Sequence, residues 1–329
     1  MRVEQFSLNA GGRDRAGAAT IHVGLVNNMP DASLRATELQ FARLLKDAAG
    51  ALDVRLHLFC LAGVERSAET HARMEGFYAD AATLQGAGVD ALIITGAEPR
   101  AGGPCREPVW QSLAALIQWS QRNTLSTVYS GAAAQAAALH LDGIDSILLQ
   151  QEMCGVLDCE RVEDDPLLQG MAAVSRMPHE RRHGLDEQEL TARGYKILSR
   201  VPYGDPDIFV RPGETLSLFL QGRPEYDADT FARAFLRDTG RFLRGEGARP
   251  NLPEGYFDRA TEDALYGLAA QAVDDGALPR YEALVSGAVP LHSWRGPAVR
   301  LFANWLTLVA AEKIRRALRN RPSVRRFRA

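Results

Sequence analysis

The 329-residue sequence has few cysteines, no long apolar run and little net charge. Four cysteines are too few over this length for a disulfide framework, so we expect a reducing, cytoplasmic setting. Its apolar runs fall short of the roughly 18 residues that cross a bilayer, so we expect no membrane contact. A net charge of −3 gives no general reason to expect a nucleic-acid partner.

Patterns typical of bound metals and targeting peptides are also missing. Cys154 and Cys159 do not have a standard zinc spacing, and no second cluster completes them, so we expect neither a metal nor a tightly bound cofactor. Residues 1–19 have charges but no apolar core, which indicates a flexible N-terminus rather than a signal peptide. Residues 321–329 form a basic tail without interleaved aromatics, which favours a solvated end.

Strands and helices alternate at short intervals in the first half of the chain. The apolar, β-rich segments Thr20–Val26, Ala91–Thr95 and Thr124–Tyr129 predict neighbouring parallel strands. Helices between them indicate an α/β, flavodoxin-like sheet covered on both faces. The second half is expected to add β-rich insertions and C-terminal helices to the same domain, which we place at residues 20–320.

Two helices are expected at less regular positions. Residues 77–84 are predicted to form a helix before the second apolar strand, and Asp227 is expected to cap a helix that runs to about Leu243. In a parallel sheet the functional site lies at the carboxyl ends of the strands. The loops at residues 27–31, 96–98 and 130–135 should therefore converge.

The segment from Ser126 to Gln135 predicts a sharp turn between a strand and a small-residue helix. Such a nucleophile elbow exposes one side chain and directs free backbone N–H groups to the same point, so it can hold a nucleophile and an oxyanion hole. The residue at the apex is Gly131, which has no atom that could form an acyl-enzyme. An ordinary strand-to-helix turn would have the same sequence pattern.

Further motifs follow one another along the chain, and together they point to one family. They are Asn28-Met29-Pro30-Asp31, Glu38-x-Gln40-Phe41, Thr95-Gly96-Ala97-Glu98-Pro99, Glu107-Pro108-x-Trp110, Leu139-His140-Leu141-Asp142-Gly143-Ile144, Gly155-Val156, Pro178-His179, Gly222-x-Pro224-Glu225-Tyr226-Asp227, Arg237-Asp238 and Asn304-Trp305-Leu306. In this order, over residues 20–308, they resemble the homoserine O-acyltransferases of the succinyltransferase type.

The resemblance implies a fold like that of class I glutamine amidotransferases and a Cys–His–Glu triad. In that family the triad takes an acyl group from acyl-CoA, a possible co-substrate here, and passes it to the homoserine hydroxyl. The family cysteine falls on Gly131 and the family histidine on Arg223, whereas the glutamate is retained as Glu225. Glycine cannot attack, and arginine stays protonated near neutral pH, so the family reaction is expected to fail.

The amino-acid side of the site also departs from the family pattern. Arg237 is retained where the resemblance implies an arginine that binds a carboxylate. Glu180 replaces a family serine, and Glu152 lies in a segment where Lys-Leu-Ser is usual, so two carboxylates would repel a substrate carboxylate. The resemblance places three more residues in the substrate site, namely Ala97, Ala132 and Tyr226.

Other residues could replace the missing groups. Ser130 precedes the apex, but its hydroxyl is expected to point away from the reaction point. His179 belongs to the pocket wall in the family and is more often a hydrogen-bonded structural residue than a base. Cys154 or Cys159 could be a relocated thiol, although a half-buried cysteine is more often a small apolar residue.

Three functions are compatible with the sequence. The first is a catalytically degenerate relative that binds a small amino-acid or acyl ligand or a protein partner. The second is an enzyme with a changed reaction, such as direct acyl transfer with Glu225 or His179 as base. The third is an active amino-acid O-acyltransferase in methionine or related biosynthesis that uses Ser130 or a cysteine.

We also expect a homodimer, because the family commonly forms one and the terminal helix has apolar residues that could serve the core or a partner. These residues are Val299, Phe302, Leu306 and Val309. Light scattering at micromolar concentration should give twice the monomer mass, and a mass of one chain would contradict this expectation.

Overall fold

The computed structural model describes residues 6–7, 20–96, 103–202, 204–270, 276–288 and 292–319. Its strands are β1 (Phe6–Ser7), β2 (Ile21–Asn28), β3 (Val54–Cys60), β4 (Tyr78–Asp80), β5 (Ala91–Gly96), β6 (Ser126–Gly131), β7 (Ile147–Arg161), β8 (Val174–Gly184), β9 (Lys196–Arg200), β10 (Pro206–Arg211) and β11 (Leu216–Leu220). Its α-helices are α1 (Asp31–Ala49), α2 (Ala68–Met74), α3 (Leu84–Ala87), α4 (Trp110–Asn123), α5 (Ala132–Asp142), α6 (Glu187–Ala192), α7 (Thr230–Leu243), α8 (Arg259–Ala269), α9 (Ala277–Gly287) and α10 (Arg295–Arg319).

One mixed sheet organises the molecule. Its strand order is β1-β3-β2-β5-β6-β11-β10-β9-β7-β8, and β4 pairs with β3. The strands from β3 to β11 run parallel, whereas β10, β9, β7 and β8 continue the sheet antiparallel. The predicted parallel neighbours β2, β5 and β6 are confirmed, and their register places Asn28, Gly96 and Gly131 in one row at the carboxyl edge.

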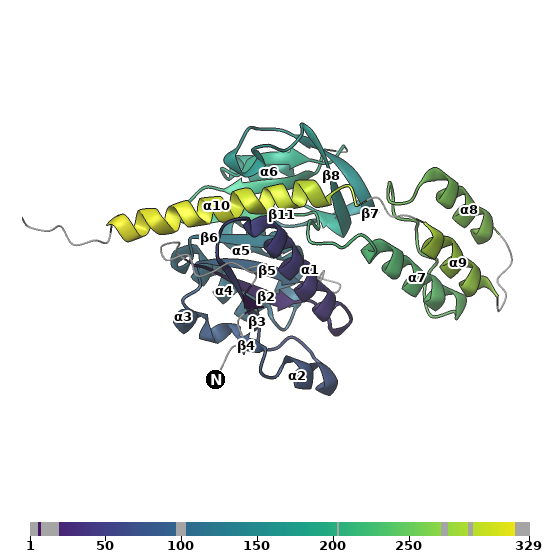
Figure 1. The fold of residues 1–329 in the computed structure, drawn as a ribbon, viewed down its shortest axis with the longest axis horizontal. Helices are drawn as coiled ribbons and strands as arrows, with labels where there is room; N and C mark the ends of the chain where they lie inside the picture. Colours follow the sequence, from purple (N-terminus) through teal and green to yellow (C-terminus); the bar gives the residue numbers. More distant parts are fainter. Residues whose placement is uncertain are drawn as a thin grey trace, which may run out of the picture.

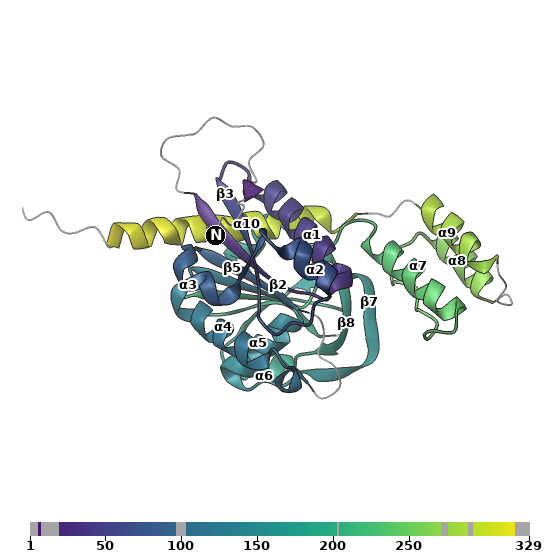
Figure 2. The same ribbon diagram turned by 90° about the horizontal axis from the view of Figure 1, so that it is seen from below.

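Helices cover both faces of the parallel strands (Figures 1 and 2). On one face, Val128 and its strand neighbours pack with residues of α1 and α10. On the other face, Tyr129 packs with residues of α4 and α5. This division follows from strand geometry, because successive side chains point to opposite faces.

The apolar residues of α10 serve the core. Phe302, Leu306 and Val309 are buried, and Val299 is partly buried against the same cluster. Burial of each large apolar side chain stabilises the fold by about 1.5–3 kcal/mol. These apolar residues could serve the core or a partner surface, and the structure assigns them to the core.

Two local expectations are wrong. Residues 77–84 form β4 and a 3-10 turn over Ala81–Thr83 instead of a helix, since the Asp80 carboxylate accepts a hydrogen bond from the Ala82 N–H and begins a turn. The helix expected after Asp227 begins at Thr230, with Asp229 at the N-cap position but without a side-chain capping hydrogen bond. Asp227 instead pairs with Arg43 of α1 at 2.6 Å.

Helices α7, α8 and α9 form a lobe that extends beyond the end of the sheet (Figures 1 and 2). An aromatic cluster that includes Phe231, Phe235 and Tyr281 holds them together. The buried Trp294 indole donates to the Tyr226 carbonyl at 2.9 Å, which connects the lobe to the strand-rich body.

Some expectations concern residues that the structure does not describe. Apart from Phe6–Ser7, which pairs with β3, the N-terminus at 1–19 lies outside the described residues, and so does the tail at 321–329. Over the described ranges, no helix combines the length and apolar character needed to cross a membrane.

A histidine pair on the sheet, in which His57 is buried and His22 is half-buried, predicts acid sensitivity. His22 Nδ1 lies 2.9 Å from His57 Nε2. Burial lowers the pKa of both rings, and the neighbouring His22 lowers that of His57 further. The folded state therefore favours the neutral imidazoles, so their contribution to stability is complete above about pH 6.5 and is lost as the pH falls below it.

We expect the free energy of unfolding, measured with urea between pH 8 and pH 5, to fall more steeply below pH 6.5 in the wild type than in His57→Gln. His71, which is exposed on α2, supplies the control variant His71→Gln. Equal pH profiles for the wild type and His57→Gln would contradict the prediction.

Candidate active site at the elbow

The predicted elbow is present between β6 and α5. Gly131 ends the strand with φ 61° and ψ −126°, and α5 begins at Ala132. A positive φ strains any residue with a Cβ atom, so this turn favours glycine unless function requires another residue. The elbow geometry thus persists without a side chain at its apex.

Ser130 faces away from the apex side. Strand alternation places it on the face of Val128, which packs with α1 and α10, whereas Gly131 shares the face of Tyr129. Ser130 has no exposed surface, and its hydroxyl has no hydrogen-bond partner among the described residues. This geometry provides Ser130 with neither access nor a base.

The Arg223 guanidinium occupies the space in front of the apex. A Cβ atom on Gly131 would lie 2.8 Å from Arg223 Cζ and 2.9 Å from Nη1. Arg223 Nη1 lies 3.5 Å from Glu225 Oε1, and both side chains are buried. Burial raises the pKa of the Glu225 carboxyl, while Arg223 opposes this shift. The position where the resemblance implies the family base therefore holds a cation that is paired with Glu225.

The turn before Arg223 is held tightly against β8 and β10. The Arg223 backbone N–H donates to the Pro178 carbonyl at 2.7 Å, and the Gln221 N–H donates to the Asp207 carbonyl at 2.9 Å. A Cβ atom on Gly222 would lie 2.9 Å from Asp207 Oδ1 and closer still to the Met177 side chain. Only glycine fits this close approach, so the turn fixes where Arg223 enters the site.

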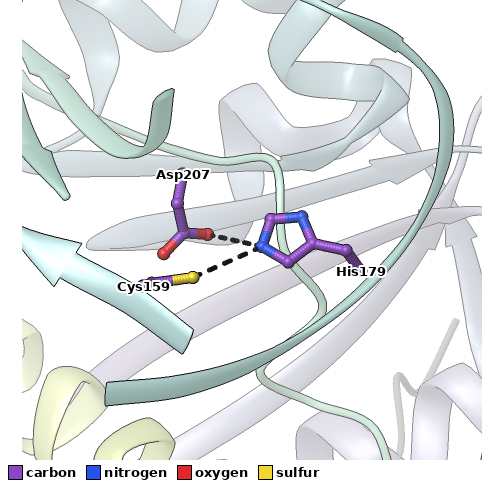
Figure 3. A group of neighbouring side chains, drawn as sticks. All are labelled: Cys159, His179 and Asp207. Carbon is purple, nitrogen blue, oxygen red and sulfur yellow. Dashed lines mark hydrogen bonds and ion pairs between the residues drawn. The ribbon is translucent and has the colours of Figure 1, made fainter. Parts of the chain in front are cut away.

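A buried cluster of Cys159, His179 and Asp207 lies beside this turn (Figure 3). His179 Nε2 lies 3.3 Å from Asp207 Oδ1 and 3.7 Å from Cys159 Sγ. Ser199 Oγ donates to Asp207 Oδ2 at 2.8 Å. The sequence points to His179 and Cys159 singly but not to Asp207, whose only signal is a carboxylate within the apolar strand β10.

The hydrogen bonds of His179 do not suit a metal ion. Arg181 Nε donates to His179 Nδ1 at 3.3 Å, so the ring proton is on Nε2 and points towards Asp207 and Cys159. A metal bound at Nε2 would displace that proton, and a ligating histidine normally donates its other N–H to an acceptor. The cluster is therefore a hydrogen-bonded cage around the Asp207 carboxylate.

The cage keeps its thiol protonated. Burial raises the pKa of Cys159 far above its usual range, and the Asp207 charge adds to this shift. Burial also lowers the pKa of His179, although Asp207 opposes this shift. Burial alone would raise the pKa of Asp207, but the hydrogen bonds from His179 and Ser199 outweigh it and lower the pKa. A protonated, buried thiol is a poor nucleophile.

A second hollow, of about 590 Å³, gathers the residues expected to bind the amino acid. Glu152, Glu180 and Arg237 line it, and the Tyr226 hydroxyl donates to Glu180. Arg237 donates two hydrogen bonds to Asp238, at 2.9 and 2.8 Å, so a ligand carboxylate would have to compete with that neighbour.

The cysteine in this hollow is also unsuited to attack. Burial, followed by the charges of Glu180 and Glu152, raises the pKa of Cys154 to about 12. The thiol is therefore protonated near neutral pH, and a thiolate is the nucleophilic form.

A separate cavity of about 310 Å³ adjoins the elbow. Ala132, one of the residues that the resemblance places in the substrate site, lines this cavity, whereas Ala97 lies outside the described residues. The residues expected to bind substrate are thus divided between this cavity and the larger hollow.

The buried cage predicts a large difference in thiol reactivity. With iodoacetamide at pH 8, the exposed Cys105 should be alkylated rapidly and Cys159 at least a hundredfold more slowly, because its thiol is buried and protonated. Peptide mass spectrometry would measure both rates, with the urea-unfolded protein as the control in which all four cysteines react. Rapid native alkylation of Cys159 would support a relocated nucleophile instead.

Known proteins are similar to this chain over most of its length. The family model described as homoserine O-succinyltransferase matches residues 6–315. A homoserine O-succinyltransferase of Rhodopseudomonas palustris is 45% identical over 304 residues, which cover 91% of each chain. One of Bradyrhizobium japonicum is 38% identical over 94% of this chain and 97% of its own.

A solved structure also aligns with most of this chain. A glutamine amidotransferase of Thermotoga maritima aligns over 88% of this chain and 98% of its own, with 12% identity and a TM-score of 0.49. The family assignment depends on the sequence matches, which span most of both chains at well above 30% identity. On these grounds the chain belongs to the homoserine O-succinyltransferase family.

Proposed function

We propose that this family member binds a small amino-acid or acyl ligand and forms no acyl-enzyme by the family route. The observation that carries the proposal is the Arg223 guanidinium, which fills the space where an apex side chain would project from Gly131. Gly131 and Arg223 stand where the family mechanism needs its nucleophile and its base. The first removes the nucleophilic atom, and the second replaces the proton acceptor with a permanent cation.

The retained polar groups support a ligand-binding role for the site. The Arg223–Glu225 pair is buried, and breaking such a pair typically costs 3–5 kcal/mol, so each partner maintains the other in place. The larger hollow combines Arg237 with Glu180, and this arrangement suits a ligand with both an anionic and a cationic group, such as an amino acid. Acyl-CoA is the proposed second ligand.

A direct acyl transfer is the second candidate, and it is supported by the names of the similar proteins and by the retained Glu225. In that reaction the homoserine oxygen would attack the thioester carbon, the coenzyme A thiolate would leave, and Glu225 would accept the hydroxyl proton. Burial raises the pKa of Glu225 and Arg223 only partly opposes this shift, so basicity does not exclude the role. The contact of Arg223 Nη1 with Glu225 Oε1 at 3.5 Å disfavours it, because the cation lies beside an oxygen that would accept the proton.

Incubation of the wild type with acetyl-CoA or succinyl-CoA should leave the intact protein mass unchanged. Transfer to homoserine, followed by coenzyme A release, should remain at the background rate. Robust turnover without a mass increase would favour direct transfer. Turnover abolished by Ser130→Ala, with a mass increase on Ser130, would overturn the proposal.

Restoring the family pattern provides a positive test. In Gly131→Cys with Arg223→His, removal of the guanidinium makes room for the thiol and supplies a base, so we expect a stable mass increase of one acyl group. The matched control is Gly131→Ser with Arg223→His, which has the same space but no thiol and should give at least a hundredfold less adduct. Equal adduct in both variants would show that acylation occurs elsewhere.

A further inference from the structure

The larger hollow is lined by the β7–β8 hairpin and by α7. The register of the hairpin places Cys154 of β7 directly opposite Glu180 of β8, so both side chains lie on the same face. Phe231 and Phe235 of α7 are buried and add apolar surface to the hollow. Its volume of about 590 Å³ is within the range of small-molecule sites.

Two arginines of the hollow are paired with carboxylates that also line it. Arg182 Nε lies 3.4 Å from Glu152 Oε2. Arg237 donates to both carboxylate oxygens of Asp238, at 2.9 and 2.8 Å. The arginine that the resemblance assigns to a substrate carboxylate therefore already binds a carboxylate of the protein.

Glu180 is the carboxylate of the hollow that has no such cation. The Tyr226 hydroxyl donates to Glu180 Oε2, which supplies a hydrogen bond but no charge. The described part of the chain places no lysine, arginine or histidine in ion-pair contact with Glu180. Two further arginines that line the hollow, Arg241 and Arg249, are exposed, so water and salt screen their charges.

The thiol opposite Glu180 is sensitive to this imbalance of charge. Burial raises the pKa of Cys154 to about 12, and the charges of Glu180, Glu152 and Asp238 add to this shift. The charges that act on this thiol are thus those of carboxylates, although arginines line the same hollow. The wall formed by the hairpin therefore has a negative potential.

A cation would be stabilised at this wall. An ammonium group at Glu180 would form a charge-assisted hydrogen bond in a partly desolvated site. A ligand carboxylate would be repelled by Glu180 and would have to displace Asp238 from Arg237.

We infer that the hollow recognises its ligand by a primary ammonium group bound at Glu180, and that small amines bind there about as well as the corresponding amino acids. This inference rests on the proposed ligand-binding function. It names the chemical group that the site selects and makes Glu180 the residue that determines specificity.

Three probes separate the two charges of an amino acid. Homoserine has both, 3-aminopropan-1-ol lacks the carboxylate, and 4-hydroxybutanoate lacks the ammonium group. Titration of the full-length protein, followed by ligand-observed NMR, should give dissociation constants for homoserine and 3-aminopropan-1-ol that agree within about threefold. The constant for 4-hydroxybutanoate should be at least about tenfold higher, since it cannot form the charged hydrogen bond.

Two variants should act in opposite directions. Glu180→Gln keeps an acceptor for Tyr226 but removes the charge, so it should weaken 3-aminopropan-1-ol binding at least about tenfold and leave 4-hydroxybutanoate binding no weaker. Arg237→Gln releases Asp238 and should tighten 3-aminopropan-1-ol binding. The matched control is Glu160→Gln, at an exposed position of β7 that does not line the hollow, and it should bind as the wild type does.

The outcomes distinguish this inference from the proposed function. Binding of 4-hydroxybutanoate as tight as that of 3-aminopropan-1-ol would overturn the inference while ligand binding stands. Unchanged amine binding in Glu180→Gln, or equal weakening of all three probes, would also overturn it, because the latter indicates a structural role. If none of the three probes binds but acetyl-CoA does, the inference alone fails. If acetyl-CoA does not bind either, the proposed ligand-binding function fails with it.

Discussion

The buried ion pair between Arg223 and Glu225 is the constraint on which the rest of the site depends. Two charges away from water are tolerated only when they are paired and hydrogen-bonded, so the surrounding strands must hold both side chains in place. The guanidinium lies where the apex of the elbow would project a side chain, and Gly131 leaves room for it. Gly131 and Arg223 are therefore sterically coupled.

Support for this pair comes from strands that lie outside the parallel half of the sheet. The turn at Gly222 passes so close to Met177 and Asp207 that a side chain cannot fit, and the cage around Asp207 fills the space behind it. The cage contains cysteine, histidine and aspartate, but the Arg181 hydrogen bond fixes the ring tautomer and burial keeps the thiol protonated. Groups that could perform chemistry elsewhere have a structural role here.

The two hollows differ in polarity. One gathers arginines and carboxylates near the lobe of α7, α8 and α9, and the other presents alanines and an aromatic ring beside the elbow. The apolar cavity includes the first turn of α5, which follows the elbow.

Sequence alone determined the parallel order of β2, β5 and β6, the elbow at Gly131, and the positions of Arg223 and Glu225, because strand periodicity and collinear motifs are local properties. The tertiary structure decided that Arg223 fills the apex space and that His179 and Ser199 surround the Asp207 carboxylate. It also decided that Ser130 faces away from the apex side of the elbow and that the apolar residues on α10 belong to the core. These features join residues that are far apart in the chain or depend on the register of neighbouring strands. No single segment of the sequence encodes such long-range contacts or such register.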